Sequence, residues 1–176
     1  MSWYRDYKGQ WKEIIETVAA EEHRTTQMIE KDTIQSMILS GVSQSDLPFV
    51  FKGGTSLSKA YGLIDRFSED IDLSMNRKLT EGEKKQTKNI ILSLAEDLGL
   101  TLTNTEDIQS RHSYNKYVFK YESLFSEVPL ELIVETSFYQ DVYPAEVHDV
   151  YSFVGRFCEK SGITLPIPFA EAKISM

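Results

Sequence analysis

Two adjacent glycines constrain the fold of this chain more than any other feature. Residues 49–51 form a short apolar run that predicts a buried strand, and Gly53 and Gly54 predict a tight turn after it. Residues 55–63 then predict a helix with Thr55 as its N-cap. Glycine lets the backbone approach a ligand closely, and amides at a helix N-terminus attract phosphate. This order favours a phosphate-binding loop over the simple turn that a glycine pair usually marks.

Two aspartates follow the glycine turn in a strictly alternating stretch. Asp70 and Asp72 alternate with Ile71 and Leu73, which predicts a strand at residues 69–74 with both carboxylates on one face. Carboxylates this close repel each other unless a cation neutralises them, so we interpret the pair as a divalent-metal site. The alternative is a pair of solvated side chains at a strand end. A metal site beside a phosphate loop predicts phosphoryl or nucleotidyl transfer.

Three further residues of the turn and helix are candidates for nucleotide contacts. Thr55 and Ser56 either belong to the phosphate loop or only cap the helix. Lys59 lies about one helical turn further on, where it either reaches a phosphate or is an ordinary exposed helical lysine.

Two more candidates lie just before the aspartates. Arg66 either clamps a phosphate with two parallel hydrogen bonds or pairs with a neighbouring acidic residue. Ser68 shares the face of Asp70 if the strand extends that far, and is otherwise a turn residue.

A third carboxylate from another strand would complete a metal site. Residues 130–135 alternate Glu131 and Glu135 with apolar residues, so both carboxylates share one face of a predicted strand. The alternative is an ordinary half-buried strand with acidic side chains toward solvent. The pattern alone does not choose between Glu131 and Glu135.

Periodicity elsewhere predicts a mixture of helices and strands. The predicted helices are residues 8–22, 26–40, 80–98 and a stretch from Pro144 to about residue 159. Thr80 and Glu83 form a capping box at the start of the third of these helices. Residues 41–46 are expected to form a loop, residues 100–103, 116–121 and 129–136 to form strands, and residues 162–176 show no clear period.

Composition limits the class of protein. The chain has 176 residues, a formal net charge of -8 and one cysteine, Cys158. The acidic balance argues against avid nonspecific binding to nucleic acid, and the single cysteine fits a reducing compartment. No stretch is long or apolar enough for a membrane span, so we expect a soluble cytoplasmic protein. The basic and aromatic residues of segment 111–121 form either a base-stacking surface or an ordinary loop and edge strand.

The motifs resemble the AbiEii/AbiGii toxin family of bacterial nucleotidyltransferases. The resemblance rests on KGGTSLSK at 52–59 and RFSEDIDL at 66–73, with further similarity in IEKD at 29–32, LIVE at 132–135 and PAE at 144–146. It implies an α+β fold with a polymerase-β-like nucleotidyltransferase core, in which helices flank a mixed β-sheet. We expect residues 1–46 to form an N-terminal helical pair that packs on this core, and residues 47–176 to form the core itself.

The resemblance also implies a site and a function. Asp70, Asp72 and Glu135 would hold Mg²⁺ or Mn²⁺, the spacing selects Glu135 over Glu131, and residues 53–56 would grip an NTP. The expected protein is a toxin of a toxin–antitoxin or abortive-infection system, which transfers a nucleotide to an RNA (tRNA-like) or protein acceptor and has a cognate antitoxin.

Length is the main departure from the family pattern. Family members run well beyond 176 residues, with a later basic motif and a helical C-terminal half. The alternative function is therefore a truncated remnant with weak or no catalysis that binds nucleotide or an antitoxin. A plain interaction module, with the aspartates as surface residues, is the third hypothesis.

Overall fold

The protein is built around one mixed β-sheet. The computed structural model describes residues 6–60, 69–105, 113–140, 144–164 and 172–175, and within them the sheet has the order β3-β4-β5-β2-β1-β7-β6. The strands are β1 (Phe49–Lys52), β2 (Asp70–Met75), β3 (Thr101–Leu102), β4 (Tyr114–Tyr121), β5 (Leu130–Gln140), β6 (Val147–Val150) and β7 (Ala172–Ser175). The β2–β5 and β1–β7 pairs are parallel, and the other pairs are antiparallel.

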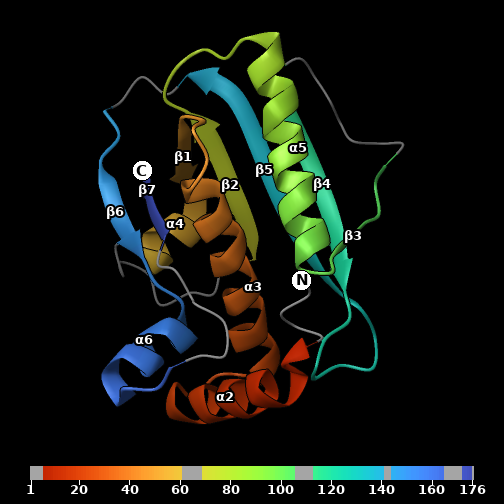
Figure 1. The fold of residues 1–176 in the computed structure, drawn as a ribbon, viewed down its shortest axis with the longest axis vertical. Coiled ribbons are helices and arrows are strands. Elements are labelled where there is room, and N and C mark those ends of the chain that lie inside the picture. Colours follow the sequence, from red (N-terminus) through yellow and green to blue (C-terminus); the bar gives the residue numbers. More distant parts are fainter. Residues whose placement is uncertain (1–5, 61–68, 106–112, 141–143, 165–171, 176) are drawn as a thin grey trace.

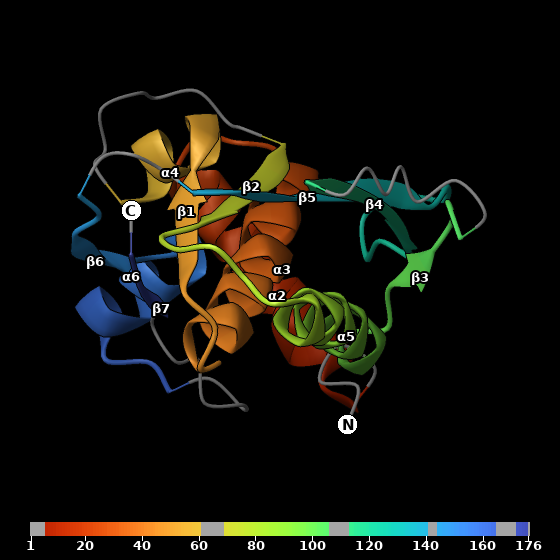
Figure 2. The ribbon, with the colours of Figure 1, turned by 90° about the horizontal axis from the view of Figure 1, so that it is seen from above.

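Two long helices cover one face of this sheet. The described helices are α2 (Lys8–Glu21), α3 (Thr26–Ser43), α4 (Gly53–Lys59), α5 (Glu81–Asp97) and α6 (Phe153–Ser161). Figure 1 shows α3 and α5 running along the sheet, with α2 and α6 across its lower end. Seen from above, α3 and α5 lie on one side of the sheet and α4 on the other (Figure 2). The predicted α+β fold with a mixed sheet and an N-terminal helical pair is confirmed. Among the described residues, no helix combines the length and the apolar character that a membrane crossing requires.

Burial explains which face of β2 meets the helices. Ile71 and Leu73 are at most 1% exposed in the hydrophobic core, whereas Asp70 and Asp72 are only partly buried. Moving the strand by one residue would expose the two apolar side chains, at a cost of about 1.5–3 kcal/mol each, and would bury the two carboxylates. The core therefore fixes both carboxylates on the sheet face that α3 and α5 leave uncovered, which we call the open face.

The end of the second helix differs from the prediction because of packing against a helix far along the chain. The predicted loop at 41–46 is wrong at its start, because α3 continues to Ser43. A side-chain carbon on Gly41 would lie 2.2 Å from Leu94 of α5, so this glycine allows close packing of two helices and does not end the first one.

The predictions for residues 144–176 are also wrong in part. The helix expected from Pro144 is a strand, β6, followed by α6, whose N-cap Ser152 accepts a hydrogen bond from the Gly155 amide at 2.8 Å. Residues 162–176, whose sequence shows no helical or strand periodicity, contribute the strand β7, which pairs with both β6 and β1. Both strands form through pairing with distant residues, which local periodicity does not reveal.

A buried ion pair connects α3, α4 and α6. The Lys59 ammonium donates to the carboxylate of Asp32, to the Asp32 carbonyl at 3.1 Å and to the Ser36 hydroxyl at 2.7 Å. Asp32 also accepts a hydrogen bond from the Phe153 amide at 2.9 Å. Both charged side chains are 4% exposed. Since buried charges are costly without partners, this network requires all its members.

We expect Asp32→Ala to destabilise the protein by about 3–5 kcal/mol, because it leaves the Lys59 ammonium buried without its counter-charge. Denaturant unfolding followed by circular dichroism measures this change. The double variant Asp32→Leu with Lys59→Met, which removes both charges, should recover a large part of the loss. A double variant less stable than Asp32→Ala alone would contradict this explanation.

Candidate active site on the open face of the sheet

Four charged residues from four neighbouring strands form a row across the open face. Lys52 of β1 is the register partner of Asp72 of β2, and Asp72 is the partner of Glu135 of β5. Glu135 is in turn the partner of Lys116 of β4. Register partners lie about 5 Å apart and direct their side chains to the same face. The row therefore places two carboxylates side by side between two lysines.

Asp70 joins this row from the same strand as Asp72. It lies two residues before Asp72, so its side chain points to the same face, and its own register partner on β5 is Ile133. The structure thus brings Asp70, Asp72 and Glu135 to one surface, and each is partly buried. Glu131, the alternative to Glu135, pairs in register with Lys120 and lies four residues along β5 from the partner of Asp72.

The two aspartates, Asp70 and Asp72, are destabilised in their charged form. Burial is the main cause that raises the pKa of Asp72, followed by the negative charges of Glu135 and Asp70. Burial also raises the pKa of Asp70, where the Glu135 charge adds to the effect and the Lys31 charge opposes it. A bound cation would relieve both the repulsion and the loss of solvation, so the site favours a hard cation with oxygen ligands.

Glu135 is paired with the neighbouring strand β4. Its Oε1 atom lies 3.4 Å from the Lys116 ammonium, and the Tyr114 hydroxyl lies near the same carboxylate, where burial and the Glu135 charge raise the pKa of Tyr114. Accordingly, within the described part of the chain, no three His, Cys, Asp or Glu side chains are gathered as a group able to hold a metal ion. Rotation of the Glu135 side chain is the change that would gather them, since the strand register already fixes the backbone.

The glycine turn lies directly against the carboxylates. Gly53 has a φ angle of 79°, and a side-chain carbon at this position would lie 2.1 Å from Oδ2 of Asp72. Glycine is therefore required here both for its backbone conformation and for the space that Asp72 occupies. Gly54 follows as the second residue of α4.

Thr55 and Ser56 secure the turn and do not cap its helix as predicted. The Thr55 hydroxyl donates to the backbone carbonyl of Asp70, which ties α4 to the start of β2. The Ser56 hydroxyl donates to the Gly53 carbonyl at 2.8 Å. The N-cap of α4 is Lys52, which makes no capping bond through its side chain. The predicted Thr55 cap is wrong because α4 already begins at Gly53, so Thr55 lies inside the helix and its hydroxyl donates to the Asp70 carbonyl.

The remaining sequence candidates separate into two groups. Lys59 does not point toward the open face, because its ammonium is bound within the buried network of Asp32 and Ser36. We therefore correct the expectation that Lys59 contacts a phosphate. Arg66 and Ser68 lie outside the described residues.

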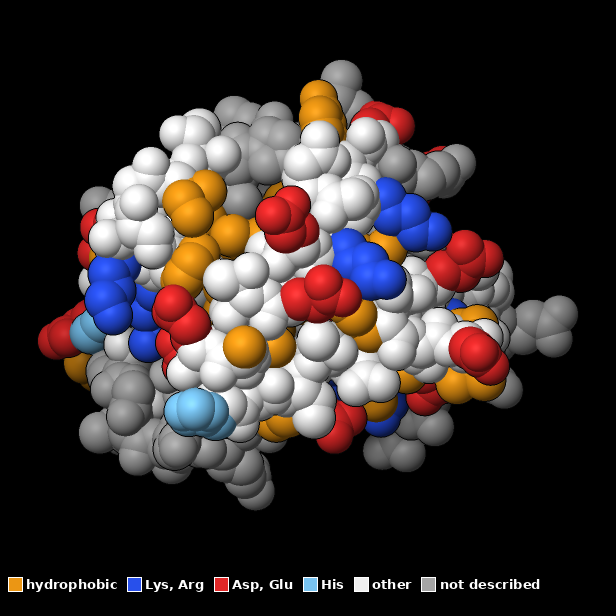
Figure 3. All heavy atoms as spheres, turned by 90° about the horizontal axis from the view of Figure 1, so that it is seen from below, with side chains coloured by type: hydrophobic (Ala, Val, Ile, Leu, Met, Phe, Trp, Pro, Cys, Tyr) orange, Lys and Arg blue, Asp and Glu red, His pale blue; other side chains and the backbone are white. Residues whose placement is uncertain are grey.

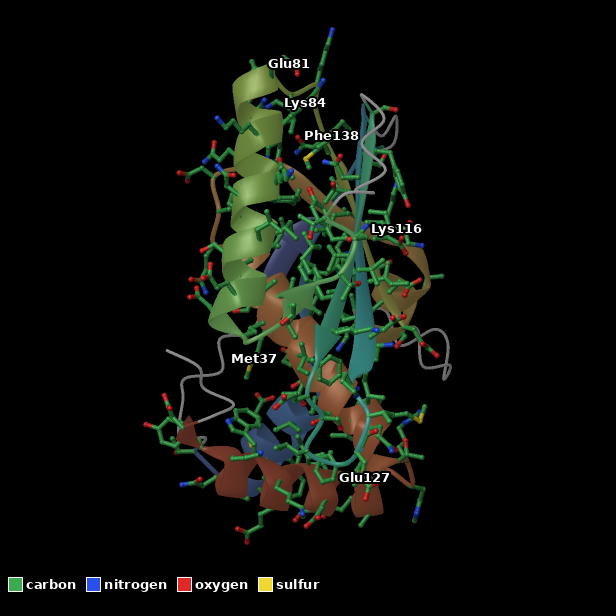
Figure 4. The ribbon with its side chains drawn as sticks, turned by 90° about the vertical axis from the view of Figure 1, so that its right-hand side faces the viewer. Met37, Glu81, Lys84, Lys116, Glu127 and Phe138 are labelled. Atoms are coloured by element: carbon green, nitrogen blue, oxygen red, sulfur yellow. The ribbon has the colours of Figure 1, made fainter. Side chains whose placement is uncertain are left out.

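Sequence reasoning missed Lys116 and Tyr114 as neighbours of the carboxylates. They belong to the basic and aromatic segment, and their even-numbered positions in β4 alternate with the buried side chains of Asn115 and Tyr117. That alternation indicated an open-face position, but only the register with β5 places them at Glu135. Figure 4 shows Lys116 on the side of the sheet opposite α5.

A groove of about 620 Å³ opens beside Asp70. It runs between the first turns of α3 and the starts of β2 and β5, where Met28, Lys31 and Ile133 are among its lining residues. The face formed by α2 and α6 has a different character, because acidic and basic side chains are interspersed among those drawn there (Figure 3). The groove and the carboxylates therefore make the open face the better candidate for substrate binding.

Two solved structures resemble this fold. JHP933 from Helicobacter pylori is 23% identical with a TM-score of 0.54, and the match covers 73% of this chain and 51% of that one. A proposed nucleotidyltransferase from H. pylori is 24% identical with a TM-score of 0.50, covering 65% of this chain and 46% of that one. This chain spans about half the length of both proteins. At these identities the likeness shows the fold alone.

Sequence comparison identifies the family. No curated protein matches the chain significantly. The family profile described as "Nucleotidyl transferase AbiEii toxin, Type IV TA system" matches residues 38–172, which include β1, the glycine turn, β2 and β5. The carboxylates and the glycine turn thus lie within the matched region, and the chain belongs to the AbiEii nucleotidyl transferase toxin family.

Proposed function

We propose that this chain is the catalytic core of a divalent-metal-dependent nucleotidyltransferase that transfers a nucleotide from an NTP to a hydroxyl acceptor. The observation that carries the proposal is the register of β2 with β5, which sets Asp72 beside Glu135, with Asp70 on the same face and the glycine turn against Asp72. Family membership supports the reaction class.

Each group has a role that follows from its position. Asp70, Asp72 and Glu135 offer the carboxylate oxygens that Mg²⁺ or Mn²⁺ prefers, and the cation would neutralise phosphate charge and orient the reacting oxygens. The backbone amides of the Gly53–Ser56 turn are proposed to bind the triphosphate, with Lys52 beside them on the same face as Asp72. Thr55 fixes the turn relative to Asp70 through its hydrogen bond. Outside the described residues, Arg66 and Ser68 remain proposed nucleotide contacts.

The partners and setting are part of the same proposal. The acceptor is an RNA such as tRNA or a protein hydroxyl, the protein acts as a toxin in the cytoplasm, and its activity is controlled by a cognate antitoxin. The contrasting outcome is a remnant that binds nucleotide without turnover. Incubation with each labelled NTP, Mg²⁺ and total RNA or protein distinguishes the two, because only the enzyme releases pyrophosphate and labels an acceptor.

We expect Asp72→Asn to lower nucleotide transfer by about 100-fold or more, as removal of one preorganised charge-stabilising group does in other active sites. Asp46→Asn, which changes a carboxylate in the connection before β1, is the matched control and should retain activity. Pyrophosphate release with saturating NTP and Mg²⁺ measures both. Equal activity in Asp72→Asn and the wild type would exclude the proposed metal site.

The same variant should be more stable than the wild type at neutral pH. The raised pKa of Asp72 means that the folded state binds a proton more tightly than the unfolded state, so this carboxyl group contributes instability as pH rises above its ordinary pKa. Removing the charge should raise Tm by roughly 1–3 °C, a modest gain because solvent screens a half-exposed group. The gain should shrink at pH 4 and should also shrink when Mg²⁺ is added to both proteins. A Tm that falls at pH 7 would contradict the electrostatic explanation.

Gly53→Ala tests the glycine turn. The positive φ angle alone costs a residue with a side chain roughly 1–2 kcal/mol, and the added carbon would displace the Asp72 carboxylate. We therefore expect both lower stability and a large loss of transfer. Gly9→Ala is the control, because no atom lies within 4 Å of its side-chain position in α2, and alanine should stabilise that helix by up to about 1 kcal/mol. Unchanged transfer in Gly53→Ala would show that the turn does not position the site.

A further inference from the structure

Glu135 forms an ion pair with a lysine of the neighbouring strand β4. The Lys116 ammonium lies 3.4 Å from its Oε1 atom, and the two side chains are 36% and 27% exposed. The Tyr114 hydroxyl lies near the same carboxylate, on the same face of β4. Both contacts draw Glu135 toward β4, whereas Asp70 and Asp72 lie on the other side of it, on β2.

The register of the strands keeps Lys116 at this place. Lys116 and Glu135 are direct partners in the β4–β5 ladder, which continues without a break from Tyr114 to Tyr121. Lys116 projects from the sheet on the side away from α5, which is the side of the carboxylates (Figure 4). Its ammonium can therefore leave Glu135 by rotation of the side chain but stays beside the site, because its backbone is fixed.

We propose that Lys116 is the internal counter-ion of the metal site: its ammonium group holds Glu135 until a divalent cation displaces it, and then binds a phosphate oxygen of the substrate. This inference rests on the proposed function, because it assumes that Asp70, Asp72 and Glu135 bind the cation. It adds a role for Lys116 in both metal binding and substrate binding.

The two roles of Lys116 have opposite effects on affinity: one weakens metal binding and the other strengthens phosphate binding. The two effects can therefore be measured separately. While Lys116 pairs with Glu135, a cation must break that pair to recruit the carboxylate, so Lys116 weakens metal binding. Once displaced, the ammonium is a positive charge without its former partner next to a site that receives a triphosphate, so Lys116 strengthens phosphate binding. A lysine that only supported the sheet would move both affinities in the same direction, through a loss of structure.

The first experiment measures Mn²⁺ affinity of the whole chain by electron paramagnetic resonance. Lys116→Gln should bind Mn²⁺ about two- to fivefold more tightly than the wild type, the range expected for release from a partly exposed ion pair. Lys116→Arg, which keeps the charge, should stay close to the wild type. Lys120→Gln is the matched control, since Lys120 lies 3.9 Å from Glu131 on the same two strands, four residues from the register of Asp72 and Glu135. Equal or weaker Mn²⁺ binding by Lys116→Gln would overturn the inference.

A double-mutant cycle distinguishes the loss of the Lys116–Glu135 pair from the general effect of removing one positive charge near the site. In a Glu135→Gln background, Lys116→Gln should no longer tighten Mn²⁺ binding, because there is no carboxylate for the lysine to hold. Tightening that persists in this background would assign the effect to long-range charge and overturn the role of the pair.

The second experiment measures substrate affinity at saturating Mn²⁺. Lys116→Gln should weaken binding of a non-hydrolysable NTP or of a short RNA with a free 3′ hydroxyl by about threefold or more, and the ligand affected identifies which phosphate the lysine binds. Unchanged affinity for both ligands would overturn the phosphate-binding half of the inference. The proposed function fails if the wild type transfers no nucleotide, or if the wild type and Asp72→Asn bind Mn²⁺ equally. Neither result depends on the Lys116 variants, so the two failures are distinguishable.

Discussion

The parallel pairing of β2 with β5 is the constraint on which the rest of the site depends. It joins two strands that are far apart in the sequence and sets Asp72 and Glu135 at the same level of the sheet. The pairing is held by the core, since Ile71, Leu132 and Val134 are completely buried on the helical side. Burial of the apolar residues thus supplies the free energy that keeps two like charges next to each other on the open face.

One turn of α3 connects this sheet to the elements around the site. Glu30 accepts hydrogen bonds from the connection between β4 and β5, including one from the Leu124 amide at 2.7 Å. Lys31 pairs with Glu69, directly before Asp70, at 3.1 Å, and Asp32 holds Lys59 of α4. Three successive residues of one helix therefore fix three segments of chain that border the carboxylates. This explains why charged residues lie in a helix that is buried along much of its length.

Sequence reasoning succeeded where a local pattern carried the information. The alternation around Asp70 and Asp72 predicted their shared face, and Thr80 with Glu83 predicted a capping box that the structure contains. It failed where the partner lies far along the chain. Lys59 has the spacing of an exposed helical lysine, but Asp32 on α3 buries it, and β6 forms only because β7 pairs with it. The division of the chain at residue 46 and the roles of the site residues remain predictions.

The position of Glu135 shows how such a site can fold without its cation. Three unpaired carboxylates on one face would oppose folding, because burial already raises the pKa of both aspartates. Pairing with Lys116 gives Glu135 a counter-charge at little cost in burial, since the partner comes from the adjacent strand. The Glu135 charge still raises the pKa of both aspartates, and burial of the apolar core offsets the repulsion that remains. The same repulsion favours a cation when one is present, so the charge arrangement that limits stability is also the one that would drive metal binding.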